Sequence, residues 1–600
     1  MVLPAMVDAV DVLVWGGGTG GVTAAIQAAR GGARTLLLTP GPWLGGMVSA
    51  AGVCCPDGNE LTPWQTGLWG AFLRELDRRE PEGLDHNWVS CFGFRPTTAE
   101  AILQDWVKSE AMLLWWPGCR LLEVERLGSR ITAVRIAIDG EQRRLRCQVV
   151  IDGSDRGDLL PLAQAPFRFG WEAQEQWSEP SAPSRARLET EPFFKQQPVQ
   201  SPTWVVMGQL QSDRLRSDPE RGLDPDGHPL LPRPFERACE AFGLERTLTY
   251  GRLPGGLVML NWPLHGNDWH WGLNRAFSAD LLLELELYRV MQAHSLRFAE
   301  ALQEASDGWL QLGKAFPADS GSPEPWLAAM PYWREGRRLI GRSTVIEQDL
   351  LPTGQDPACA PLPRNQAGAL QSIAVGNYAN DHHYPGPDWP LAAKSCRWGG
   401  RWTGTPFCIP YGALVSVEID NLLAADKAIS TSHMANGATR LQPLVMNVGQ
   451  AAGAAAALSV AQAIPPSQCP VLQLQELLIN DRVAPSAVVP NWASAWNDPF
   501  WSDHQHRALL GSSPLARREW SGSSATDGDH ESVLTGNIHP CANQGFRLQT
   551  PDGMDWPVIT LEPSVQAWMN TVKGPTPTAL RGILNRWGPW LRVTGLVDQG

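Results

Sequence analysis

A glycine-rich turn between a short apolar run and an alanine-rich segment constrains this chain more than any other feature. Residues 12–15 are typical of a strand buried on both faces, and residues 22–30 indicate a helix. Between them, Gly16, Gly18 and Gly21 follow the spacing G-x-G-x-x-G. A second apolar run over residues 34–39 completes strand, turn, helix and strand within about thirty residues. The segment therefore predicts a βαβ unit that opens a Rossmann-like α/β domain.

Each glycine of this turn has a physical role in holding a dinucleotide. The first permits the tight turn, the second lets the backbone approach a pyrophosphate, and the third lets helix and strand pack closely. The helix N-terminus offers free N–H groups and the positive end of its dipole to the phosphates. We therefore expect Gly16, Gly18, Thr19, Gly20 and Gly21 to bind a dinucleotide. The alternative is a glycine-rich turn without a ligand.

The end of the second predicted strand lacks the acidic residue that usually holds the adenosine ribose. Thr39 stands at this position, and a single hydroxyl cannot accept hydrogen bonds from both ribose hydroxyls as the two oxygens of a carboxylate can. No arginine follows at once to bind a 2′-phosphate. Thr39 is therefore the only candidate for the ribose contact, and the pyrophosphate contact is the firmer prediction.

Four later segments carry a resemblance to a known family. They are Gly45-Gly46-Met47, residues 149–159, residues 332–341 and residues 421–453. The second is similar to a strand ending in D-A-T-x-E-G-D-L, and the third to Y-x-R-E-S-R-R-x-x-G. Together they resemble the bacterial FAD-dependent oxidoreductases of the glutathione-reductase-like superfamily, which are distantly similar to fumarate reductase flavoproteins. The resemblance covers residues 8–480 and implies that FAD is the cofactor.

The chain departs from this family pattern in places. Gly153-Ser154 stand where alanine and threonine are usual, Arg156 replaces a glutamate, and Gly336 replaces a serine. The resemblance nevertheless implies that residues spread over the whole region contact FAD. Besides the glycine turn and Thr39, the candidates are Gly45, Gly46, Met47, Leu121, Asp152, Gly153, Asp426, Leu441, Gln442 and Pro443.

The long Ala/Gly-rich helix predicted over residues 441–463 has its own reason to face a flavin. Reduced flavin carries negative charge near N1 and the C2 carbonyl, which backbone N–H groups at a helix start stabilise. Pro443 in the first turn costs no hydrogen bond. The resemblance implies that this helix start points at the pyrimidine end of the ring.

Flavin chemistry requires the protein to position a substrate, move a proton and balance charge, so histidines and arginines are the catalytic candidates. His433 follows the strand that closes the flavin site, whereas His265 and His382 lie in polar clusters. Histidine titrates near neutral pH and suits acid–base work. Arg334 could bind a substrate carboxylate bidentately, and Arg440 is the second cationic candidate. The alternatives are structural: histidines that form hydrogen bonds, and arginines in an internal salt-bridge network.

The composition of the chain excludes several kinds of binding partner and site. Lys and Arg number 49 against 62 Asp and Glu, and the net charge of −13 argues against nucleic acid or an anionic membrane. Eleven cysteines without a C-x-x-C indicate reduced thiols and no zinc site. No apolar run approaches the ~18 residues of a membrane span, and no basic region precedes the first apolar run, as a signal peptide would need. We expect a cytoplasmic protein without a bound metal, with homo-oligomerisation left open.

Six hundred residues are too many for one hydrophobic core. We predict a FAD-binding domain over residues 1–170 and 395–484, with an inserted α+β substrate domain over 171–394. Residues 172–203, rich in Glu, Gln, Ser and Pro, are expected to form a linker or surface loop. Short alternating runs predict a small, mostly β C-terminal domain over 485–600, with an OB-like barrel as the candidate fold.

These features predict an oxidoreductase that transfers a hydride between a small organic substrate and flavin N5. Oxygen, a quinone or another acceptor could be its redox partner. A single dinucleotide fingerprint argues against a separate NAD(P)H domain. The alternative, motivated by 28 tryptophans, is a structural flavin with lyase- or hydrolase-like chemistry on a carbohydrate. A scaffold protein that acts through its C-terminal domain is a third hypothesis.

Overall fold

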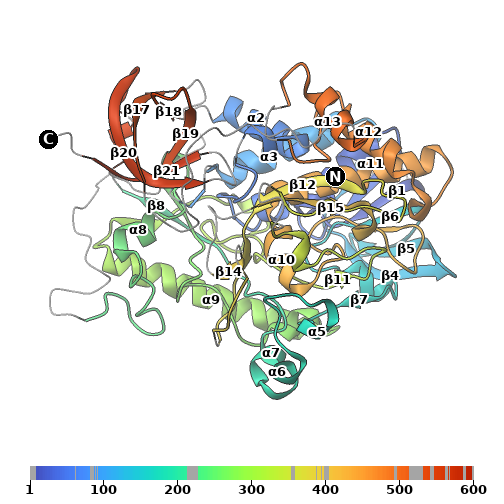
Figure 1. Cartoon of the computed structure of the whole chain (residues 1–600). Coiled ribbons are helices and arrows are strands. Elements are labelled where there is room, and N and C mark those ends of the chain that lie inside the picture. Colours follow the sequence, from blue (N-terminus) through green and yellow to red (C-terminus); the bar gives the residue numbers. More distant parts are fainter. Residues whose placement is uncertain are drawn as a thin grey trace.

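A seven-stranded sheet is built on the predicted βαβ unit and lies on the right of the view in Figure 1. Its strands run in the order β3-β2-β1-β6-β5-β4, and β16 pairs with the end of β6. The strands β3, β2, β1, β6 and β16 are parallel, whereas β4 and β5 add an antiparallel hairpin. Their bounds are β1 Ala9–Trp15, β2 Thr35–Leu38, β3 Leu113–Trp116, β4 Arg120–Leu127, β5 Arg130–Ile138, β6 Glu141–Asp152 and β16 Leu422–Ala424.

This computed structural model describes residues 8–597 apart from several short stretches. The stretches left out are 61, 81–86, 88, 91, 212–227, 353–358, 387, 393–394, 398–404, 492–495, 512–531, 541–545, 561–564, 566–567, 570 and 586–589. Part of the predicted barrel segment, residues 586–589, therefore lies outside the described residues.

Helix α1 (Thr19–Arg30) connects β1 and β2, and helix α11 (Gln442–Ala461) packs against it. The glycines of α11 explain its small-residue sequence. A Cβ on Gly449 would lie 2.1 Å from Thr23 Oγ1, and one on Gly453 would lie 2.2 Å from the Ala24 carbonyl oxygen. Contrary to the sequence expectation, α11 is long and apolar enough to cross a membrane, but 83% of its apolar window is buried inside the protein. It has the character of a core helix.

Two further helices, α2 (Gly67–Arg79) and α3 (Pro96–Ser109), pack on the same domain. The middle of the chain adds small sheets around the long helix α9 (Leu281–Ala305). Strand β7 (Phe167–Arg168) pairs with β11 (Arg338–Leu339). This pairing joins the end of the first FAD-binding segment to the middle of the chain. The other elements are β8 Val206–Leu210, β9 Leu257–Leu260, β10 Leu310–Leu312, β12 Ser372–Tyr378, β13 Asn380–His382, β14 Ser395–Arg397, β15 Thr405–Pro410, α8 Gly243–Thr249 and α10 His433–Thr439.

The segment predicted as a linker is more regular than expected. It holds three short helices, α5 (Gln174–Trp177), α6 (Arg185–Thr190) and α7 (Pro192–Gln196). The physical reason is an aromatic anchor: the rings of Phe193 and Phe194 lie 6.1 Å and 5.1 Å from that of Trp171. The prediction of a loop was therefore wrong for much of this segment.

The C-terminal part forms a closed five-stranded barrel in the order β17-β18-β19-β21-β20, seen in red in Figure 1. Its strands are β17 Ser532–Pro540, β18 Phe546–Gln549, β19 Asp555–Thr560, β20 Thr576–Asn585 and β21 Trp590–Leu596. The barrel has its own apolar core, which includes Ile538, Leu548 and Leu580. The small mostly β domain is therefore confirmed. Helices α12 (Val471–Ile479) and α13 (Trp501–Leu509) instead contribute to the main core, so that core extends past residue 485.

Candidate functional site

The two glycine turns singled out in the sequence lie against each other at the carboxyl end of β1. The Gly45 N–H donates to the Gly17 carbonyl at 2.8 Å, and Thr19 Oγ1 donates to the Gly45 carbonyl at 2.7 Å. Gly45 and Gly46 have φ of +104° and +51°, which only glycine adopts readily. A Cβ on Gly46 would lie 2.9 Å from Gly18 Cα. The close approach of two backbones therefore explains why both turns are glycine.

The remaining glycines let α1 sit directly on the ends of the parallel strands. A Cβ on Gly21 would lie 2.1 Å from the Gly16 carbonyl oxygen, and one on Gly153 would lie 2.3 Å from Gly21 Cα. Gly153, one of the departures from the family pattern, thus serves helix–strand contact. Its neighbour Asp152 is buried and accepts hydrogen bonds from the Ser154 N–H and the Leu159 N–H, each at 3.0 Å. Burial raises the pKa of Asp152 to about 7.

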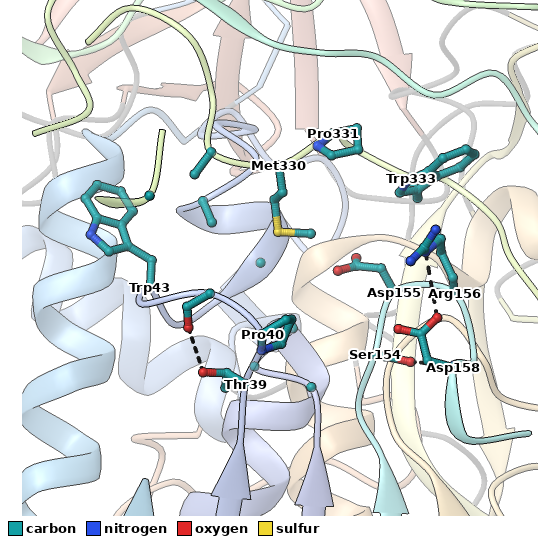
Figure 2. Close-up of a pocket in the computed structure, with 18 of the residues that line it drawn as sticks. Thr39, Pro40, Trp43, Ser154, Asp155, Arg156, Asp158, Met330, Pro331 and Trp333 are labelled. Atoms are coloured by element: carbon teal, nitrogen blue, oxygen red, sulfur yellow. Dashed lines mark hydrogen bonds and ion pairs between the residues drawn. The ribbon is translucent and has the colours of Figure 1, made fainter. Parts of the chain in front are cut away.

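A cavity of about 370 Å³ opens at these turns (Figure 2). It lies at the carboxyl ends of β1, β2 and β6, where ligands bind in open α/β sheets. Thr39 and Trp43 stand on one side, and Arg156 and Trp333 on the other. Its lining includes Trp15, Gly16, Gly17, Gly18, Thr39, Pro40, Gly41, Pro42, Trp43, Gly46, Ser154, Asp155, Arg156, Asp158, Trp204, Tyr288, Met330 and Trp333.

Four of the predicted cofactor residues line this cavity: Gly16, Gly18, Thr39 and Gly46. The others lie behind its wall or farther away, namely Thr19, Gly20, Gly21, Gly45, Met47, Leu121, Asp152, Gly153, Asp426, Leu441, Gln442 and Pro443. Leu121 lies on β4 and packs, half-buried, against the main core. The residues at the start of α11 are buried outside the lining.

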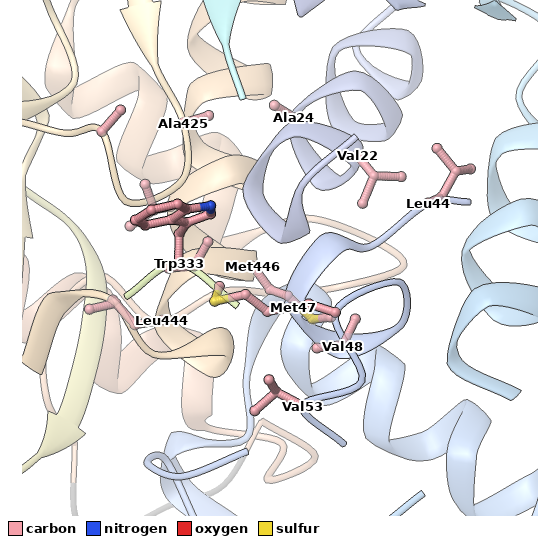
Figure 3. Close-up of a cluster of buried hydrophobic side chains, with 14 of the residues drawn as sticks. Val22, Ala24, Leu44, Met47, Val48, Val53, Trp333, Ala425, Leu444 and Met446 are labelled. Carbon is pink, nitrogen blue, oxygen red and sulfur yellow. The ribbon is translucent and has the colours of Figure 1, made fainter. Parts of the chain in front are cut away.

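Trp333 marks the limit of the cavity toward α11. Its indole lines the cavity and also belongs to a buried apolar cluster with Met47, Leu444 and Met446 (Figure 3). The side chain is 1% exposed. Its Nε1 has no hydrogen-bond partner among the described residues. Trp333 therefore connects the wall of the cavity to the apolar core around α11.

The hydroxyl of Thr39 is already engaged in the turn beside the cavity. Thr39 Oγ1 donates to the Gly41 carbonyl at 2.7 Å and accepts from Trp115 Nε1 at 3.0 Å. One acceptor lone pair is left for a ribose hydroxyl. The ribose contact at this position is thus a single hydrogen bond at most.

Sequence reasoning missed a buried ion triad next to the glycine turn. The Lys427 ammonium is fully buried and bonds to Asp155 and, at 3.0 Å, to Asp426 Oδ1. Burial lowers the pKa of Lys427, but the two carboxylates outweigh it and hold the pKa above its ordinary value. Burial and the charge of Asp155 raise the pKa of Asp426, despite the opposing charge of Lys427. The adjacent Asp-Lys pair at the end of an apolar strand was the signal that could have revealed the triad.

His433 and Glu335 form a second buried charge cluster. His433 Nδ1 lies 3.0 Å from Glu335 Oε1, and His433 Nε2 has no partner among the described residues. Glu335 also accepts from the Gln200 N–H at 3.0 Å and pairs with Arg338 Nε at 3.1 Å. The Trp171 ring covers the imidazole, with ring centroids 3.7 Å apart. One imidazole nitrogen is thus fixed by a carboxylate and the other is left available.

His382 lies beside His433. Their rings are nearly parallel, with centroids 6.3 Å apart. Neither nitrogen of His382 has a hydrogen-bond partner in the described part of the chain. Burial, with a smaller contribution from the nearby His433, lowers the pKa of His382 well below its ordinary value. His382 is therefore neutral at physiological pH.

The two candidate arginines are joined through one buried network. Arg334 pairs with Asp268 at 3.0 Å, and Asp268 contacts His383 Nδ1 at 3.3 Å. His383 Nε2 contacts Asp381 at 2.9 Å, and Asp381 contacts Arg440 at 3.4 Å. The positive charge of each arginine is therefore balanced by a buried carboxylate of the protein, Asp268 for Arg334 and Asp381 for Arg440. The structure does not bring the fifth candidate, His265, to this network, because it lies on an exposed turn with φ of +58°.

Both cysteines near the second turn are buried in the main core. Cys54 Sγ donates to the Val48 carbonyl at 3.4 Å. Among the described residues, no group of three or more His, Cys, Asp or Glu side chains is placed to hold a metal ion. Of the charged groups described above, Asp155 lines the cavity, whereas His433, His382 and Glu335 lie outside its lining.

A comparison with models of known protein families shows which family the chain belongs to. A family model described as "FAD dependent oxidoreductase" matches residues 11–478. The chain belongs to this family. FAD is therefore its cofactor, as the resemblance implied, and the chain is an enzyme of the oxidoreductase kind. No curated protein matches the chain.

Three solved structures show weak similarity to this chain. OxyS anhydrotetracycline hydroxylase from Streptomyces rimosus has 11% identity and a TM-score of 0.24, over 35% of this chain and 39% of that one. The aromatic hydroxylase CabE from angucycline biosynthesis has 14% identity and a TM-score of 0.29, over 56% and 54%. Aquifex aeolicus GidA has 18% identity and a TM-score of 0.19, over 28% and 33%. The chain thus spans less than two thirds of each, and these likenesses say nothing about its substrate.

The glycine turn and the cavity fit the phosphate end of FAD. The first N–H groups of an α-helix have no acceptor within the helix, and three glycines of the turn before α1 face the cavity. The same turn leaves no room for a side chain at Gly16, where a Cβ would lie 2.6 Å from the Ser154 nitrogen. A backbone that close to a cavity suits a pyrophosphate.

Proposed function

We propose that this oxidoreductase transfers a hydride between a small organic substrate and FAD, and that His433 moves the accompanying proton. The observation that carries the proposal is the buried His433–Glu335 pair, with Nδ1 3.0 Å from the carboxylate and Nε2 unpaired among the described residues. A histidine oriented by a carboxylate is a recurrent acid–base device in enzymes.

The chain offers residues for each part of the cofactor. Gly16, Gly18 and the start of α1 would hold the pyrophosphate, and Thr39 would hold the adenosine ribose. When bound, FAD supplies a centre that accepts or gives two electrons. The start of α11 at Leu441 is the proposed contact for the ring, because helix N–H groups stabilise negative charge.

The protein's own part is to hold and move a proton. Glu335 accepts a hydrogen bond from the Nδ1–H of His433, which leaves the Nε2 lone pair to take a proton from a substrate hydroxyl or amine. The imidazolium that forms is stabilised by the same carboxylate, and Arg338 and the Gln200 N–H hold that carboxylate in place. His382, 6.3 Å away between ring centroids, is kept neutral by burial and so adds no second positive charge beside the imidazolium.

Aromatic packing shields this pair from water. Trp171 covers His433 with its ring tilted by 35°, and Tyr384 and Trp389 pack on Trp171 at ring distances of 5.0 Å and 5.8 Å. Exclusion of water strengthens the interaction of an imidazolium with its carboxylate. This use of aromatic side chains accounts for several tryptophans without a carbohydrate ligand.

We also infer that the enzyme acts in the cytoplasm. The eleven cysteines of the sequence include no C-x-x-C pair, which favours thiols over a disulfide framework or a zinc site. Reduced thiols are the rule in that compartment. The acidic net charge of −13 supports a small molecule over nucleic acid as the partner.

An anaerobic absorption titration tests the proposal. The FAD-loaded protein is mixed with fractions of a small-metabolite extract, and the flavin bands are followed. We expect one fraction to bleach them in the wild type, and His433→Gln to slow the bleaching at least tenfold while dithionite still reduces it normally. His506→Gln on α13 is the matched control. If no fraction bleaches the bands although dithionite does, a reductase awaiting a donor or the structural-flavin alternative is favoured.

A further inference from the structure

Two segments that are distant in the sequence meet at the end of the cavity beside β2. Trp43 lines the cavity and stands on the same side as Thr39 (Figure 2). Ser320 and Gly321, which come from the middle of the chain, line the same cavity. A Cβ on Gly321 would lie 3.0 Å from Pro42 Cδ, so this turn packs directly on the segment that carries Trp43.

The indole of Trp43 is held in place by packing and still borders the cavity. The residue is only 9% exposed, yet it is part of the cavity lining. The ring of the buried Phe316 lies 5.8 Å from the indole, measured between ring centroids. Phe316 is outside the lining, so it supports the indole from the protein side. An aromatic surface in a fixed position therefore borders this end of the cavity.

This end of the cavity is where the adenosine half of a dinucleotide lies. In a dinucleotide-binding βαβ unit, the pyrophosphate lies at the glycine turn and the adenosine ribose at the end of the second strand. Here that strand is β2, and Thr39 follows it. Thr39 Oγ1 is already bonded to the Gly41 carbonyl and to Trp115 Nε1, which leaves one hydrogen bond at most for the ribose. The adenosine therefore needs a second contact, and the adenine ring is the part of it that can make one.

We propose that Trp43 binds the adenine ring of FAD by stacking, and that this contact replaces the ribose-binding carboxylate that the chain lacks at Thr39. Stacking on an aromatic side chain is a major source of affinity for a base, and it depends on the flat face of the base and not on its hydrogen-bonding groups. Pro40 and Pro42 add apolar surface to the lining beside Trp43. The inference rests on the proposed placement of the pyrophosphate at the glycine turn.

Binding titrations with FAD, ADP and FMN test this contact. ADP carries the adenosine and the pyrophosphate, whereas FMN carries the flavin without the adenosine. The dissociation constants are measured by calorimetry on the full-length protein after removal of bound nucleotide. Trp43→Phe keeps an aromatic ring, and Trp43→Leu keeps apolar bulk without one. Trp271→Leu is the matched control, because it makes the same substitution at a tryptophan that is 59% exposed and lies outside the cavity lining.

We expect Trp43→Leu to weaken the binding of FAD and ADP by at least about tenfold, which corresponds to about 1.4 kcal/mol, and to leave FMN binding within about twofold. Trp43→Phe should weaken FAD and ADP by less than about threefold, because a phenyl ring also stacks on a base. Trp271→Leu should leave all three dissociation constants unchanged. Thermal unfolding checks that each variant is folded. If Trp43→Leu does not fold, the wild type is titrated with GDP, which should bind within about tenfold of ADP because stacking tolerates a change of base; no binding of GDP overturns the inference.

Unchanged binding of FAD and ADP by folded Trp43→Leu also overturns the inference. If the wild type binds ADP in that case, the placement of the pyrophosphate survives and only the stacking fails. If the wild type does not bind ADP, the proposed placement itself fails. An equal weakening of FAD, ADP and FMN shows general damage to the cavity, and an equal loss in Trp43→Phe and Trp43→Leu shows that the shape of the indole matters and stacking does not. Either result refutes the inference.

Discussion

His433 Nδ1 lies 3.0 Å from Glu335 Oε1, with both side chains buried in the core. The two residues are 98 positions apart in the chain: Glu335 lies two residues after the cavity residue Trp333, and His433 is the first residue of α10. Because the carboxylate fixes one nitrogen, the pair has a defined direction for proton transfer.

Glu335→Gln should slow the reaction without weakening substrate binding. A glutamine can still accept a hydrogen bond but cannot balance an imidazolium, so a loss of about 10²-fold in the limiting rate of flavin bleaching is expected. The concentration of the active fraction that gives half the limiting rate should stay unchanged. A matched change in both quantities would show instead that Glu335 only shapes the site.

Lys427→Met should destabilise the protein strongly. It leaves Asp155 and the fully buried Asp426 without their shared cation, and breaking a buried ion pair in this way costs about 3–5 kcal/mol. Guanidinium denaturation curves of the FAD-free protein measure the loss. The control is Arg34→Met, which removes the partner of Asp11 from a pair whose arginine is 63% exposed. Its cost should stay below about 1 kcal/mol, and a similar cost for both variants would contradict the prediction.

Local patterns in the sequence predicted the parts of the fold that depend on short-range spacing. The G-x-G-x-x-G turn, the small-faced helix α11 and the strands of the barrel all follow from periodicity and glycine content. The two glycine turns could be placed together because both follow strands of one βαβ unit.

The remaining site features depend on contacts between distant segments. Glu335 lies in the motif of residues 332–341, and nothing near it in the sequence points to His433. Lys427 and Asp155 meet across 272 residues. Trp333 stands at the variable position of its motif, so its place as the wall of the cavity could not be read from the pattern. Contacts between residues that are distant in the chain leave no local pattern in a single sequence, so they could not be predicted from it.

Asp152 should make stability fall as the pH rises toward neutrality. Burial raises its pKa from 3.8 to about 7 in the folded protein. Between these two values the folded state binds more protons than the unfolded chain, so the free energy of unfolding decreases as pH rises. Asp152→Asn cannot titrate and should show a flatter pH dependence between pH 5 and 8, although it is less stable overall. Equal slopes in denaturation curves of the two proteins would refute the assignment.

Removal of residues 512–600 should leave the main body of the enzyme folded. The barrel buries its own core around Ile538, Leu548 and Leu580, whereas Trp501 and Leu509 of α13 belong to the main core. Separate cores usually fold as separate units. We therefore expect the fragment 1–511 to bind FAD within about threefold of the full-length affinity, a difference below about 0.7 kcal/mol, and to be bleached by the same fraction.

A fragment ending at residue 484 is the matched comparison, because it also removes α13 and exposes the surface that Trp501 covers. It should aggregate or unfold at lower temperature. If the fragment 1–511 binds FAD but is no longer bleached, the barrel takes part in the reaction, whereas full bleaching leaves the scaffold hypothesis without support.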